Sequence, residues 1–122
     1  MHYAILCYDR EEVVSAWTKE EDDAAIGHLA LVQRRLAAEG KLGPVGRLVP
    51  TKRAKTLRKG REAIITDGPF AETKEQLLGF FIVDCASMEE AIEAAQALGK
   101  ASSSEGAYEI RELSVFLPTP PA

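Results

Sequence analysis

The stretch LLGFFIVD (77–84) decides the fold of this chain, because the β-strand that it predicts is apolar on both faces. β-Forming residues make up most of the stretch, which ends in the charged residue Asp84. Side chains alternate between the two faces of a strand, so we expect one face to carry Leu77, Gly79, Phe81 and Val83 and the other to carry Leu78, Phe80 and Ile82. A sheet with one face in water alternates apolar and polar residues, which this strand does not do. Both faces of the sheet therefore need a cover.

Two strands, a helix and a hairpin are predicted before this stretch. HYAILCY (2–8) is a short apolar run rich in β-formers, which indicates a buried strand. Thr18 and Glu21 form a capping box, and apolar residues at helical spacing follow it until Gly40, a residue suited to the left-handed position after a helix. The other elements are a strand at GPVGRLVP (43–50) and a hairpin built from AKTLR (54–58), the turn KGR (59–61) and EAIIT (62–66).

A second helix and a last strand are predicted after it. Ser87 and Glu90 open the helix, and its apolar face runs until Gly99. AYEIRELSVFL (107–117) is typical of a strand. The tail PTPPA (118–122) is expected to be extended and mobile, because it is rich in proline and joins neither a sheet nor a helix. We therefore expect one domain over residues 1–117 followed by this tail.

The order of these elements predicts an α+β fold of the ferredoxin-like, split βαβ type. Such a fold has an antiparallel sheet with two helices on one face. The helices leave the second face of the sheet bare, although its strands are apolar there as well. We expect a second copy of the sheet to cover it, so that the chain forms a two-fold homodimer through its sheet faces.

Composition and charge exclude several classes of protein. The formal charge of −4 argues against a nucleic-acid-binding protein, whose affinity comes from neutralising phosphates. The apolar runs are far shorter than a membrane-spanning helix and no signal peptide opens the sequence, so we expect a cytoplasmic protein. Cys7 and Cys85 lie in β-like apolar runs and are expected to be buried free thiols without a disulfide. His2 and His28 make no metal-binding pattern, so we expect neither a metal nor another cofactor.

Two residues are candidates for acid–base chemistry. His28 is expected to border the buried stripe of the first helix, where an imidazole can exchange protons near neutral pH. Asp67 begins the stiff turn DGPF (67–70), a position suited to a carboxylate that orients a histidine. The structural alternatives are a half-buried histidine bonded to backbone and an aspartate that only closes an Asx turn.

Four other residues are candidates for binding a substrate, namely Arg47, Phe70, Glu72 and Lys74. Glu72 and Lys74 also suit a solvated loop, and Phe70 also suits a core plug beneath the turn. Arg47 opens the stretch 47–61, which carries seven positive charges and no negative one. This basic stretch is able to attract an anionic substrate or an acidic partner, although lysine-rich hairpins also protect sheet edges from aggregation.

Two segments carry a resemblance to a known family. TDGPFAETKEQLLGFFIVD (66–84) closely resembles the signature of the DGPF branch of the YCII-related proteins, and GHLALVQRRLAAEGKLGPVGRL (27–48) resembles the histidine-bearing helix and the next strand of YciI-like members. The chain departs from the family pattern at Leu78, where a second glycine is common, and at Phe81, where tyrosine is common. It also lacks a proline after the second helix.

The resemblance implies a dimeric α/β barrel of ferredoxin-like subunits, with a site built on His28 and Asp67. We therefore expect a cytoplasmic YCII-related protein that transfers a proton on a small polar or aromatic molecule, in a lyase-, isomerase- or hydrolase-like step without a cofactor. Many DGPF genes are associated with extracytoplasmic-function sigma factors. The alternative expectation is therefore a regulatory, non-catalytic module that binds a partner of this kind.

Overall fold

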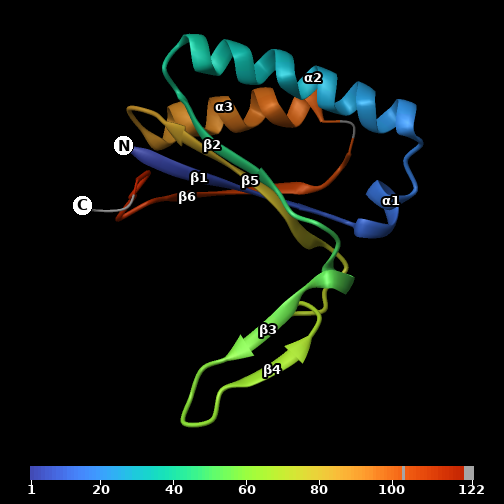
Figure 1. The fold of residues 1–122 in the computed structure, drawn as a ribbon. Helices are drawn as coiled ribbons and strands as arrows, with labels where there is room; N and C mark the ends of the chain where they lie inside the picture. The colour runs from blue at the N-terminus through green and yellow to red at the C-terminus, as the bar shows by residue number, and fades with distance from the viewer. Residues whose placement is uncertain (103, 120–122) are drawn as a thin grey trace.

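A computed structural model describes residues 1–102 and 104–119 of the chain. It is an α+β structure in which α2 and α3 lie side by side across one face of a four-stranded sheet, and a separate hairpin projects from the other side (Figure 1). In chain order the elements are β1 (His2–Asp9), α1 (Glu11–Ser15), α2 (Lys19–Ala38), β2 (Leu42–Arg47), a short 3-10 helix (Thr51–Arg53), β3 (Lys55–Arg58), β4 (Ile64–Asp67), β5 (Gln76–Asp84), α3 (Met88–Ala101) and β6 (Ala107–Glu112).

The sheet has the strand order β2-β5-β1-β6, and each pair of neighbours is antiparallel. The two strands that are apolar on both faces, β1 and β5, therefore lie at its centre, as the sequence predicts. Their register is regular from His2 opposite Asp84 to Cys7 opposite Gly79, and it then shifts at a β-bulge in which Leu78 is the additional residue. Bulges of this kind re-aim side chains, often beside functional sites.

The helix boundaries follow from local signals in the sequence. Thr18 accepts a hydrogen bond from the backbone of Glu21, and the side chain of Glu21 accepts one from the backbone of Thr18, which confirms the capping box. Gly40 follows α2 with φ +71°, in the region that glycine adopts more readily than other residues. The helix α3 begins after Ser87 as predicted, but it continues through Gly99 to Ala101, because glycine lowers helix stability without preventing a helix.

The core lies between the two helices and the sheet. Its largest fully buried side chains are Tyr3, Ile5, Val83 and Leu98. Burying an aliphatic side chain of this size stabilises the fold by about 1.5–3 kcal/mol. Cys85 is buried among them and Cys7 is half-buried, and both are free thiols. The prediction of two unpaired, core-type cysteines is confirmed.

The face of the sheet opposite the helices is also apolar, and we call it the open face. Leu6 pairs with Phe80 and Ala4 pairs with Ile82 across β1 and β5 on this face. In the single chain Ala4 and Ile82 are buried, and Leu6 and Phe80 are half-buried. None of the helices of residues 1–102 and 104–119 covers it (Figure 1). The ring of Phe116, from the segment after β6, lies 4.5 Å from the His2 ring. The apolar second face that the sequence predicts is present, and its cover by a second copy stays a prediction.

The hairpin of β3 and β4 is confirmed, with Leu57 directly opposite Ile65. It forms a two-stranded sheet of its own and extends away from the helices (Figure 1). Its supporting turn begins at Gly68, whose φ of +99° lies in the region that glycine adopts more readily than other residues.

Other elements also differ from the sequence-based expectation. The helix α1 was not expected, because a five-residue helix depends on tertiary contacts and not on propensity. The strand β2 ends at Arg47 and not at residue 50, and β6 ends at Glu112 and not at residue 117. One further residue after each strand, Leu48 and Leu113, still donates a backbone hydrogen bond to the neighbouring strand, to Leu78 and His2 respectively. Of the predicted tail, Pro118 and Thr119 are exposed, and residues 120–122 lie outside the described part of the chain.

Candidate functional site: a cavity between the first long helix and the sheet

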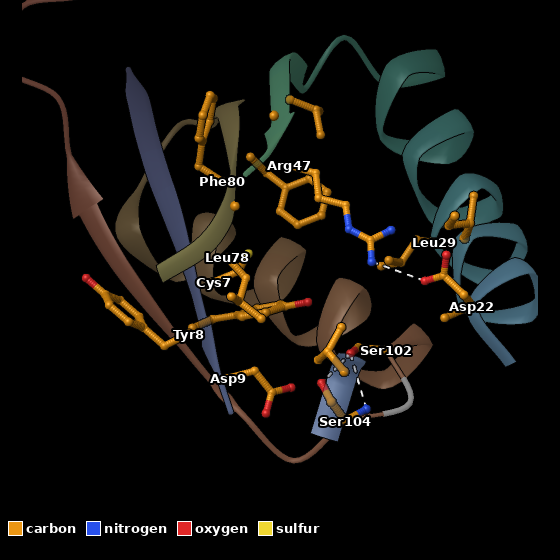
Figure 2. Close-up of a pocket in the computed structure, with 18 of the residues that line it drawn as sticks. Cys7, Tyr8, Asp9, Asp22, Leu29, Arg47, Leu78, Phe80, Ser102 and Ser104 are labelled. Carbon is orange, nitrogen blue, oxygen red and sulfur yellow. Dashed lines mark hydrogen bonds and ion pairs between the residues drawn. The ribbon is translucent and has the colours of Figure 1, made fainter. Parts of the chain in front are cut away.

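A cavity of about 230 Å³ lies between α2 and the helix-covered face of the sheet, and we call it the inner cavity. It is found at the end of the sheet where β1 ends and β6 begins (Figure 2). Val14 and Trp17, from α1 and the turn after it, close one side. Most of its lining is aliphatic or aromatic, with a few polar groups among these side chains. A hollow of this composition is typical of a small-molecule site.

The helix α2 supplies one wall of the inner cavity. Asp22, Ala25, Ile26, Leu29 and Gln33 line it, and they recur every three or four residues along the helix. Residues at this spacing lie on one face of a helix. The same stripe continues into the core through the buried residue Leu36, so the packing of α2 on the sheet fixes the position of the wall.

The sheet supplies the opposite wall. In β1, residues 3, 5, 7 and 9 share the helix-covered face, and Cys7 and Asp9 line the cavity at its end. Tyr108 lies directly opposite Cys7 on β6. Leu78, the additional residue of the bulge, also lines the cavity. The bulge therefore adds the Leu78 side chain to the wall. In a regular strand this side chain would point to the opposite face of the sheet.

Cys7 and Tyr108 are both protonated at neutral pH. Burial raises the pKa of the Cys7 thiol to about 12, although the neighbouring Tyr108 lowers it in part. Burial and then the nearby Cys7 raise the pKa of the Tyr108 phenol to about 12, although Ser102 lowers it in part. A thiol with a raised pKa is a poor nucleophile, because the thiolate is the reactive form. Cys7 is therefore a neutral wall of the cavity, and Tyr108 is a hydrogen-bond donor.

Asp9 is the charged residue at the inner end of the cavity. Its relative exposure is 9%, and one carboxylate oxygen accepts a hydrogen bond of 2.7 Å from the backbone of Arg10. Within residues 1–102 and 104–119, no other hydrogen bond and no ion pair involves this side chain. In the same part of the chain, no fully buried polar side-chain atom lacks a partner, so the second oxygen is not fully buried. Asp9 lines the inner cavity. Serines 102 and 104, which hydrogen-bond one another, line the cavity near it (Figure 2).

Arg47 and Asp22 form an ion pair at the other end of the inner cavity. The guanidinium nitrogen lies 3.1 Å from the Asp22 carboxylate (Figure 2). Both side chains also line a second hollow of about 410 Å³, beside α1, which we call the outer groove. The ion pair thus stands between the two hollows. Because both side chains are partly exposed, the pair adds little stability.

Comparison with known sequences places the chain in a family. A model of the YCII-related domain matches residues 1–117. The chain belongs to the YCII-related domain family. An uncharacterized protein of Rhizobium meliloti (strain 1021) is 56% identical to it over 119 residues, which cover 97% of this chain and 96% of that protein.

In this YCII-related protein, His28 does not have the position that the sequence predicts. It is exposed on α2 and does not line the inner cavity. At 100° per residue it lies about 120° around the helix from the centre of the cavity-lining stripe. The expectation that it borders the buried stripe was wrong, because this stripe is narrow and His28 falls outside it. Its catalytic role stays a prediction.

Asp67 ends β4 on the projecting hairpin, on the opposite side of the sheet from α2 (Figure 1). Its side chain is 84% exposed and forms an ion pair and hydrogen bond with Lys55, its partner across β3 and β4. The backbone of Gly68, in contrast, donates to Ala54. One subunit therefore does not bring His28 and Asp67 together.

The other candidates lie in three places. Arg47 lines the inner cavity, as described above. Phe70 is 76% exposed, with the Arg58 guanidinium 5.4 Å from the centre of its ring, so the expectation of a core plug was wrong. The turn lies at the base of the hairpin, where no core is available to cover the ring. Glu72 and Lys74 are exposed and line a shallow hollow beside the 3-10 helix.

Some site residues were missed by sequence reasoning. Asp9 ends the strand His2–Asp9 in phase with the buried residues Tyr3 and Ile5 and the half-buried Cys7, and this alternation was the available signal. Trp17 had no such signal, because its position depends on α1. Among the described residues, no group of three or more acidic, histidine or cysteine side chains is arranged to hold a metal ion. In the same residues, no helix has the length and apolar character that crossing a membrane requires.

Proposed function

We propose that this YCII-related protein binds a small molecule with an apolar body and a polar end in the inner cavity, and that a proton transfer is carried out on the bound molecule. The observation that carries the proposal is the composition of this cavity. Its walls are largely apolar, and its polar groups gather at two ends, with Asp9 and Tyr108 at the inner end and the Arg47–Asp22 pair at the other. Apolar walls supply binding energy, and a few placed polar groups supply orientation.

A variant that fills the cavity tests the binding proposal. Leu29→Trp places a larger side chain in the α2 wall, and Leu31→Trp makes the same kind of change on the exposed side of the same helix, where Leu31 is 62% exposed. The measurement is a thermal-shift screen with small aromatic and aliphatic alcohols, amines and acids. A ligand at one hundred times its Kd adds about 2.7 kcal/mol, which corresponds to roughly 10 °C for a chain of this size.

We expect at least one chemical class to raise the melting temperature of the wild type and of Leu31→Trp, but not that of Leu29→Trp. Equal shifts in all three proteins would place the binding site elsewhere. A screen without any shift in the wild type would contradict the proposal itself. Circular dichroism of each variant shows whether it has kept the fold.

The predicted acid–base pair of His28 and Asp67 belongs to the same proposal. Neither side chain lines the inner cavity of one chain. Proton transfer by this pair therefore requires an assembly that carries both groups to the bound molecule. The proposed assembly is a homodimer through the open face, supported by the apolar pairs Leu6–Phe80 and Ala4–Ile82 on that face.

The projecting hairpin favours a second candidate function, in which the protein binds a regulatory partner such as an extracytoplasmic-function sigma factor. Leu57, Ile64 and Ile65 are exposed on the hairpin, and Phe70 is exposed at its base. Leu57 lies within the basic stretch 47–61. Arg58 of this stretch pairs with Ile64 across the hairpin, and its guanidinium lies 5.4 Å from the centre of the Phe70 ring. An exposed apolar group with a charged rim is typical of a protein-binding surface.

A further inference from the structure

The carboxylate of Asp9 has an environment that the fold alone does not explain. It is the buried charged side chain of the described residues, and its backbone partner Arg10 occupies one of its two oxygens. The side chain of Arg10 pairs instead with Glu12 at 2.6 Å. No cation of the described chain therefore compensates the buried carboxylate.

Burial without compensation is unfavourable for a carboxylate. A buried acidic group is normally paired or fully hydrogen-bonded, because it loses the hydration that water provides. Asp9 lines the inner cavity together with the neutral groups Cys7, Tyr108, Ser102 and Ser104. A ligand that brings a hydrogen-bond donor to the second oxygen of Asp9 would replace the missing hydration. A ligand without a donor would remove the remaining water and leave the carboxylate unpaired.

The size of the cavity limits the ligand. An engineered apolar cavity of about 150 Å³ binds benzene. By proportion, the 230 Å³ of the inner cavity hold roughly nine non-hydrogen atoms, which is one ring with a short substituent. The aromatic and aliphatic walls, which include Trp17, Leu29 and Phe81, suit the apolar body of such a ligand.

We propose that the ligand of the inner cavity is a one-ring amphipathic molecule whose hydroxyl or ammonium group donates a hydrogen bond to the Asp9 carboxylate. This proposal rests on the proposed function of the cavity. The apolar body lies against the α2 stripe and the sheet. The Arg47 guanidinium stands at the opposite end and uses one nitrogen for Asp22, which leaves donors for a polar substituent at the far end of the ligand. Asp9 is thus the residue that selects the ligand class.

Matched pairs of probes test this assignment. 4-Ethylphenol and 4-ethyltoluene have the same shape and differ by a hydroxyl in place of a methyl group, and benzylamine and ethylbenzene differ by an amine in place of a methyl group. Their dissociation constants are measured by NMR titration of the wild type, Asp9→Asn and Asp23→Asn. Asparagine at position 9 keeps an oxygen for the backbone of Arg10, and Asp23 is an exposed control on α2.

In the wild type we expect at least one donor-bearing probe to bind at least tenfold more tightly than its hydrocarbon match, because a site built for a donor rejects an analogue that leaves its polar group unpaired. This ratio should fall at least fivefold in Asp9→Asn and stay unchanged in Asp23→Asn. Equal affinity within both wild-type pairs would overturn the assignment, and so would a ratio that survives in folded Asp9→Asn.

The two proposals fail in different ways. Binding of the hydrocarbons and of the donor-bearing probes with equal affinity, abolished by Leu29→Trp, would leave the cavity as the binding site and remove the role of Asp9. Failure of every probe to bind the wild type would remove both proposals. The wild-type comparison within each pair needs no variant, so it decides the assignment even if Asp9→Asn does not fold.

Discussion

At the scale of single residues, Cys7 and Tyr108 in the wall of the inner cavity should make the free energy of unfolding depend on pH. They lie directly opposite one another on β1 and β6, and burial is the main cause that raises the pKa of each to about 12. The ordinary values are 9.0 for the thiol and 10.0 for the phenol. The folded protein therefore holds these protons at pH values where the unfolded chain has released them.

The free energy of unfolding should accordingly fall as the pH rises. Between about pH 9 and 12 the folded state binds more protons than the unfolded state, so the stability that is complete below pH 9 is lost through this range. Denaturant titrations of the wild type and of Cys7→Ala, from pH 7 to 11, measure the effect. We expect a steeper decline above pH 9 in the wild type, and parallel curves would show that burial of Cys7 does not control its ionisation.

The predictability of a residue depends on how far its environment is set by its neighbours in sequence. Cys7 and Cys85 were correctly expected to be free core-type residues because each lies in an apolar run. Phe70 was misjudged because the turn in which it lies has no core beneath it, and this follows from the direction of the hairpin. Asp9 was missed although its spacing from Cys7 places it on the buried face.

At the scale of elements, the β3–β4 hairpin differs from the rest of the structure. It pairs with itself and not with the main sheet, and the cross-strand pair Leu57 and Ile65 is exposed. An isolated two-stranded hairpin is marginally stable in water. Its amide hydrogens should therefore exchange much faster than those of β1 and β5 in the protein alone, and hydrogen–deuterium exchange measured by NMR checks this.

The partner-binding candidate predicts that a purified extracytoplasmic-function sigma factor from the same organism slows this exchange. The effect should disappear in a variant with Arg53→Glu, Lys55→Glu and Arg58→Glu, because these changes reverse the charge of the hairpin. A control variant carries Lys19→Glu, Arg34→Glu and Lys100→Glu, which reverse three exposed charges on the helices. In this control the sigma factor should slow the exchange of the hairpin amides as it does in the wild type. Protection that survives the hairpin changes, or a hairpin already protected in the protein alone, would contradict this candidate.

Most elements could be predicted because their signals are local. The capping box of Thr18 and Glu21 and the glycine after α2 define a helix without knowledge of the fold. α1 was missed for the opposite reason. Its five residues are held by contacts distant in sequence, including two hydrogen bonds between Glu11 and Thr51.

At the scale of the whole molecule, the open face is apolar, and Leu6 and Phe80 on it are only half-buried in the single chain. A stable dimer that covers this face should bury about 800 Å² of each copy, the standard size of a specific interface. Phe80→Arg introduces a charge on this face, and Leu31→Arg introduces one on the exposed side of α2. We expect analytical ultracentrifugation to find a dimer for the wild type and Leu31→Arg and a monomer for Phe80→Arg, with all three folded by circular dichroism. A monomeric wild type would contradict the dimer.

The sequence pattern predicts the arrangement of the sheet and helices well, because alternation and helical period report which faces are buried. It predicts the inner cavity poorly. That cavity forms where the end of β1, the bulge at Leu78 and the helix α2 meet, and each lies far from the others along the chain. Its polar groups come together only after the sheet has formed and α2 has packed on it.

The strand order has a consequence for how the protein is made. β1 is synthesised before its two neighbours, yet it pairs with β5 and β6, which lie some 70 and 100 residues further along the chain. Folds dominated by such distant pairings form slowly, since the intervening chain must close into loops first. During translation, HYAILCY therefore waits as an unpaired apolar segment until nearly the whole domain has left the ribosome. This interval is the period in which a chaperone has most reason to bind the nascent chain.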